Sequence, residues 1–88
     1  MAWHLCRVLH VHLHLHERGA IIRDLEGREC DDLAGAQAAA IGAIRDVIAA
    51  DVRSGVLDLS GSIAICDADD ALLAIVSFRD AITVVADA

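Results

Sequence analysis

Four histidines alternate with apolar residues near the start of the chain, and their type and spacing suit metal chemistry. Residues 9–16 read Leu-His-Val-His-Leu-His-Leu-His. In an extended strand, side chains two residues apart point to the same face, with Cα atoms about 6.5–7 Å apart. Neutral imidazole nitrogens are zinc ligands. A metal-binding module on His10, His12 and His14 is therefore one interpretation of the pattern.

Such a site needs a further donor from a neighbouring strand, and Cys30, Cys66 and Asp67 carry suitable ligand atoms. Nothing in the sequence places these residues beside the histidines. One alternative is a solvent-facing strand that happens to be rich in histidine. Another is a pH switch, in which the four imidazoles repel one another when protonated and loosen the strand in acid. All three interpretations stay open at this point.

Other catalytic or cofactor-binding patterns are weak. Asp67, Asp69 and Asp70 crowd one segment, but calcium needs six to eight oxygens in a shaped loop, and this segment lacks the glycine and the distal glutamate. A turn is the better interpretation. The serines have no nucleophile-elbow context, and the scattered glycines form no phosphate-binding loop. We expect no cofactor and no enzyme activity, although folding could still bring a cysteine and a histidine together.

Net charge and cysteine number limit the kinds of partner and the cellular compartment that we expect. The 88 residues carry a formal net charge of −7, and all seven cationic residues are arginines, which never cluster. An acidic chain without a basic stripe should repel nucleic acid and anionic membranes. The odd number of cysteines fits reduced thiols in the cytoplasm better than a disulfide framework. With no recognisable signal peptide and no apolar run near 20 residues, we expect a cytoplasmic location.

The hydrophobic periodicity predicts six or seven short elements and one long helix. Strict alternation over residues 9–16 predicts a strand whose leucine and valine face meets the core. Residues 1–7 should fray. The other predicted elements are strands at 20–23, 62–66 and 72–77, a very short strand at 28–30 and a helical turn at 78–81, followed by an edge strand or an apolar tail at 82–85.

The helix should run from an N-cap at Asp32 to Ser54, with Gly55 as the stop signal. Its predicted core stripe is made of large apolar residues and one alanine: Leu33, Ala40, Ile41, Ile44, Val47 and Ile48. Asp51 falls on the buried side near the C-terminal end, where a carboxylate is unfavourable. We expect it to reach a backbone N–H or a cation, with a role at an interface as the alternative.

The opposite face of this helix is unusually small and apolar. It carries Gly35, Ala38, Ala39, Gly42, Ala49 and Ala50. Small residues let another element approach closely, although alanine is also the best helix former. With 57% hydrophobic residues in so short a chain, we expect part of the apolar surface to be covered by a second copy or another protein.

The order β-β-(β)-α-β-β predicts one α+β domain over residues 1–88, with a small antiparallel sheet of about four strands packed on the long helix. Five short segments, residues 23–29, 32–33, 57–61, 67–70 and 78–81, resemble the family known as domain of unknown function 6894, and the similarity runs roughly from His12 to Val84. The chain differs from that family at Asp70, where glycine is usual, and at Ser77, where proline is common. The family implies no activity and no functional residues.

A weaker resemblance is to the HicB-type antitoxin domain, in which a strand hairpin precedes a Glu-Cys-Asp-Asp-Leu segment and an alanine-rich helix, here at residues 29–33. Those domains pair with a toxin and often carry an added DNA-binding segment. The sequence therefore favours a non-catalytic interaction or homodimerisation domain. The alternatives are an antitoxin-like partner protein and a metal-binding module on the histidine strand.

Overall fold

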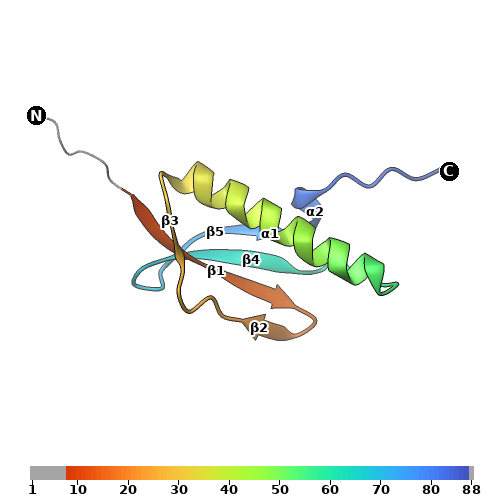
Figure 1. Ribbon diagram of the computed structural model, residues 1–88, viewed down its shortest axis with the longest axis horizontal. Helices are drawn as coiled ribbons and strands as arrows, with labels where there is room; N and C mark the ends of the chain where they lie inside the picture. The colour runs from red at the N-terminus through yellow and green to blue at the C-terminus, as the bar shows by residue number, and fades with distance from the viewer. Residues whose placement is uncertain (1–7, 88) are drawn as a thin grey trace, which may run out of the picture.

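The computed structural model describes residues 8–87, so the expected frayed segment 1–7 lies outside the described residues. It contains five strands and two helices in the predicted order (Figure 1). The elements are β1 Leu9–Glu17, β2 Ala20–Ile22, β3 Arg28–Cys30, α1 Leu33–Arg53, β4 Ser62–Asp67, β5 Leu72–Ser77 and α2 Phe78–Ala81. The α+β class is confirmed, and the short segment at 28–30 adds a fifth strand to the expected four.

All the strand pairs are antiparallel, and the path through the sheet is β2-β1-β4-β5. The three-residue strand β3 also pairs with β1, beside its first half, while β2 pairs with its second half. Arg18 and Gly19 both have positive φ and join β1 to β2. Positive φ at both positions of a two-residue loop matches the right-handed twist of a hairpin.

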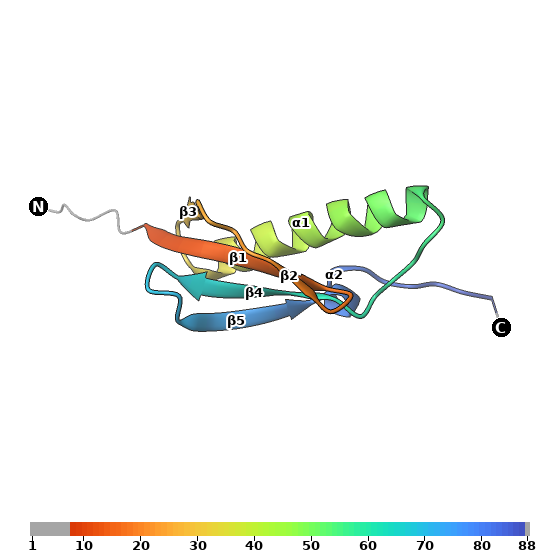
Figure 2. The same ribbon diagram turned by 90° about the horizontal axis from the view of Figure 1, so that it is seen from below.

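Helix α1 crosses one face of this sheet, as Figures 1 and 2 show. Its predicted caps are confirmed: Gly35 N–H donates to the Asp32 carboxylate at 2.8 Å, and Ser54 is the C-cap. Gly55 follows with φ +91°. Beyond Ala81 no strand forms, so residues 82–87 are the apolar tail rather than the edge strand.

The core lies between α1 and the leucine face of β1. Val11 is fully buried, and Leu9, Leu13 and Leu15 pack against the cluster, as the alternation predicts. The buried residues of α1 are spaced four apart: Ala36, Ala40, Ile44 and Ile48. Leu33, predicted to be in this stripe, is 37% exposed because it is the first helical residue, ahead of the turn where Ala36 meets the sheet.

By length and composition, α1 would be able to cross a membrane. In this fold one stripe of the helix packs on the sheet, at Ala36, Ala40, Ile44 and Ile48. The two alanines have no exposed surface and let the helix backbone lie close to the strands. The outer face at Gly35, Ala38 and Gly42 remains exposed.

Candidate functional site

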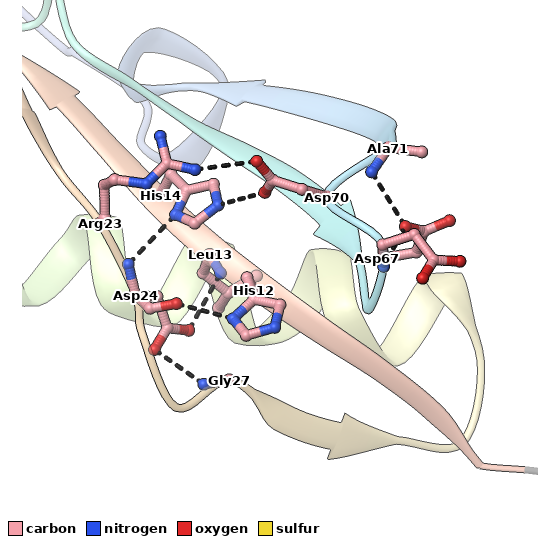
Figure 3. A network of polar contacts seen from close by, with 10 residues as sticks. His12, Leu13, His14, Arg23, Asp24, Gly27, Asp67, Asp70 and Ala71 are labelled. Carbon is pink, nitrogen blue, oxygen red and sulfur yellow. Dashed lines mark hydrogen bonds and ion pairs between the residues drawn. The ribbon is translucent and has the colours of Figure 1, made fainter.

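The histidine side of β1 faces away from α1, and two of its imidazoles bond to the connection between β2 and β3, which runs along the edge of β1. Figure 3 shows this segment, residues 23–27, running alongside β1, with Asp24 beside His12 and His14. His14 keeps only 6% of its surface exposed, and the other three histidines are partly buried. The interpretation of a solvent-facing histidine strand is therefore wrong for His14, which lies between Asp24 and Asp70, whereas His10, His12 and His16 stay partly exposed.

Asp24 fastens this loop through both its backbone and its side chain. The His12 Nδ1–H donates to the Asp24 carbonyl at 2.6 Å, and the Asp24 N–H donates to His14 Nδ1 at 3.1 Å. The carboxylate accepts from the Leu13 N–H and the Gly27 N–H, each at 3.0 Å. Four hydrogen bonds on one residue hold the loop against the central part of β1.

These contacts define the proton positions on two imidazole rings. A carbonyl only accepts, so His12 carries its proton on Nδ1. A backbone N–H only donates, so His14 Nδ1 is bare and its proton is on Nε2, which lies 2.9 Å from Asp70 Oδ1. Both nitrogens of His14 are therefore engaged, one with the loop and one with the β4–β5 turn.

Asp70 joins the histidine face to that turn. It has φ +66°, a left-handed conformation that favours glycine. The hydrogen bond from His14 and the nearby Arg23, whose Nη2 lies 2.8 Å from Asp70 Oδ2, keep the Asp70 pKa below its usual value. The predicted turn is confirmed, since the Asp67 carboxylate accepts from the backbone N–H of Asp69 and Ala71.

Cys66 is the sequence-predicted thiol that the fold brings to this face. It is opposite His12 in the β1–β4 register and is 7% exposed. Burial raises its pKa, and the negative charges of Asp70 and Asp67 raise it further. The neutral thiol is therefore favoured, which is the opposite of what an activated cysteine nucleophile needs.

Among the described residues, one group has the chemistry of a metal site: His14, Cys66 and Asp70 offer donor atoms within 4.8 Å of one another. This is not the predicted trio of His10, His12 and His14. A metal on His14 Nε2 would move the ring proton to Nδ1, where it would face the Asp24 N–H donor. The hydrogen bonding therefore fits a structural lock better than a metal centre.

The other predicted donors lie elsewhere. Cys30 is opposite Leu9 on β3, and the Asp67 carboxylate is used within its own turn. The residues that complete the network, Arg23 and Asp24, were not singled out as site residues by sequence reasoning. The one available signal was the Asp-x-x-Gly spacing of Asp24 and Gly27, which is typical of a side chain that caps its own turn.

Asp51 meets a cation, as expected, although from another element. Arg18, in the β1–β2 turn, places Nη2 3.1 Å from Asp51 Oδ2 and Nε 3.3 Å from Asp58 Oδ2. The Arg18–Asp51 contact is an ion pair without an aligned hydrogen bond. Burial and the neighbouring Asp51 raise the pKa of Glu17. This cluster ties the hairpin end to the C-terminal end of α1.

The fold and this site define a small α+β domain in which the β2–β3 loop is held against the edge of β1 by Asp24 and two histidines. The chain belongs to the family described as domain of unknown function (DUF6894), whose model matches residues 10–79. No curated protein and no solved structure matches the chain. The weaker resemblance to HicB-type antitoxins receives no support from these comparisons.

The hydrogen bonds that the Asp24 carboxylate accepts from Leu13 and Gly27 should make the stability of the protein sensitive to acid. Burial acts to raise the Asp24 pKa, but the hydrogen bonds from Leu13 and Gly27 outweigh it and the pKa is lowered. A lowered pKa gives stability that is complete above the unfolded-state value of about 3.9 and is lost as pH falls through the folded-state value. We expect Asp24→Asn to cost about 1–3 kcal/mol at pH 7, with a smaller cost below pH 4, measured by urea unfolding.

The control for that measurement is Asp46→Asn, which removes one exposed carboxylate from the outer side of α1. Its unfolding free energy should follow the wild-type pH dependence throughout. An Asp24→Asn cost that is the same at pH 3 and pH 7 would mean that the charge of the carboxylate adds nothing to the lock.

Proposed function

We propose that this protein is a non-catalytic protein–protein interaction domain that forms a homodimer in the cytoplasm. The observation that carries the proposal is the amount of apolar surface left open. Thirteen large aliphatic residues are more than a third exposed, whereas seven large apolar residues are buried. A partner that covers part of this surface would remove apolar area from water, which favours association.

The site chemistry supports a role without catalysis. Both ring nitrogens of His14 are engaged, and the raised pKa of Cys66 disfavours its thiolate. The unpaired thiols of Cys30 and Cys66 suit a reducing compartment. A net charge of −7 argues against nucleic acid and anionic membranes as partners.

Multi-angle light scattering behind a sizing column, from about 10 μM to 1 mM, tests the proposal. We expect a mass near twice the 9.3 kDa of one chain at high concentration. Salt should strengthen the association, because two chains of charge −7 repel each other through solvent and salt screens that repulsion. A constant mass of one chain over the whole range, in low and high salt, would exclude the homodimer.

A further inference from the structure

Strand β5 forms one edge of the sheet, and no described segment pairs with its outer side. Figure 2 shows β5 as the outermost strand, with no ribbon beyond it. An edge strand presents unpaired N–H and C=O groups, which are a template for another strand. The opposite edge is divided between β2 and β3, each three residues long, so the six-residue β5 is the longest free edge.

The composition of β5 leaves this edge almost unprotected. Natural sheets usually protect exposed edges with lysine, proline, inward charges or bulges. Residues 71–77 read Ala-Leu-Leu-Ala-Ile-Val-Ser, without a charge or a proline. Leu72 and Ile75 are 58% and 61% exposed. The one protective feature is an irregularity in the β4–β5 register that skips Leu73, which leaves regular pairing over Ala74–Ser77.

We propose that β5 is the dimer interface and pairs antiparallel with β5 of a second copy, which makes one continuous sheet of the two chains. The inference rests on the proposed homodimer and names its surface. An antiparallel strand paired with itself has two-fold symmetry, so each copy presents the same groups to the other. No second sequence has to be complementary to this edge.

Charge at the two ends of β5 favours this partner. The acidic residues Asp69 and Asp70 precede the strand, and Arg79 follows it. In an antiparallel pair centred on Ile75, the end of β5 that leads into Arg79 and Asp80 of α2 lies beside the start of β5 of the other copy. Asp70 is held there by His14 and Arg23 of its own chain, so Asp69 is the carboxylate that Arg79 of the other copy would meet. Arg79 has no ion pair with any described residue of its own chain. The uncharged strand therefore lies between an acidic turn and an arginine without an ion pair among the described residues, and the two-fold axis brings the two together.

The test introduces a lysine at the edge and the same lysine elsewhere. Ile75 faces the helix-free side, beside Ala64, and is 61% exposed, so Ile75→Lys should leave the fold intact. We expect the dimer dissociation constant to rise at least tenfold in sedimentation equilibrium. The control is Ile21→Lys, on the same face at the far edge and 55% exposed, which should leave that constant unchanged.

Two further measurements distinguish edge pairing from other contacts. Arg79→Asp should weaken the dimer several-fold in low salt and have a much smaller effect at 1 M salt, where charges are screened within about 3 Å. Backbone amides of β5 that do not pair with β4 should gain hydrogen-exchange protection as the concentration is raised into the dimer range.

Different results would overturn the homodimer and the β5 interface. A wild-type protein that stays a monomer overturns both the homodimer and its interface. A wild-type dimer that Ile75→Lys does not weaken, or that Ile21→Lys weakens equally, keeps the homodimer and overturns the β5 edge. An Arg79→Asp variant that binds as tightly as the wild type, or β5 amides whose protection does not change with concentration, overturns the antiparallel pairing.

Discussion

Phe78→Ala is expected to lower the free energy of unfolding by about 3–5 kcal/mol, because truncating a fully buried aromatic side chain removes its transfer energy and leaves a cavity. Phe78 has no exposed surface and is the largest fully buried side chain among the described residues. The remaining core is built from smaller aliphatic residues and alanines. A chain of 88 residues has a total stability of about 4–13 kcal/mol, so this one change removes a large share of it.

The position of the Phe78 ring also explains why residue 61 is a glycine. A Cβ atom on Gly61 would lie 2.8 Å from the Phe78 ring and 2.8 Å from the His16 carbonyl oxygen. The Phe78 N–H donates to the Gly61 carbonyl at 2.9 Å, which fixes the two backbones together. The ring therefore fills the space directly over the start of β4, and only glycine fits beneath it.

A double-mutant cycle in urea checks this contact. Gly61→Ala should be destabilising in the wild-type background and less so with Phe78→Leu, since the smaller side chain can yield. Val85→Ala, at a residue that is 90% exposed, is the control and should change stability by less than about 0.5 kcal/mol. Equal costs of Gly61→Ala in the two backgrounds would show that the ring and the glycine do not interact.

The elements with strong local signals could be predicted from the sequence. Alternation over residues 9–16 determines β1 and its core face, because a one-residue change of register would bury the histidines and expose the leucines. Asp32 and Gly55 determine the ends of α1 through hydrogen bonding and φ. These are local constraints that act within a few residues, so no knowledge of the tertiary structure was needed.

Predicting the site requires information that the local sequence does not carry. Asp24 reaches His12 and His14 across the sheet face, and Asp70 reaches His14 across 56 positions of the chain. The helix stripe was also shifted at its first turn, where Ala36 rather than Leu33 meets the sheet. In both cases the outcome depends on which segment covers a given face, and that is a property of the packed molecule.

Gly27→Ala should destabilise the protein by about 2–5 kcal/mol, which is the second of the two largest effects. Gly27 has φ +73°, and a Cβ there would lie 2.6 Å from the Val11 carbonyl oxygen and 2.7 Å from His10 Nε2. The left-handed backbone costs an alanine about 1–2 kcal/mol, and forcing a methyl group against a packed strand costs about 1–3 kcal/mol more. Val11 is in the core and cannot yield easily.

Two other glycines separate these contributions. Gly19 has φ +75° and open space around it, so Gly19→Ala should cost only the backbone strain, about 1–2 kcal/mol. Gly42 lies within α1, also with open space, and Gly42→Ala should stabilise the protein by about 0.5–1 kcal/mol. A Gly27→Ala cost in urea unfolding that is no larger than the Gly19→Ala cost would mean that the loop is not pressed against β1. The packing of the loop on β1 would then be looser than the hydrogen bonds of Asp24 imply.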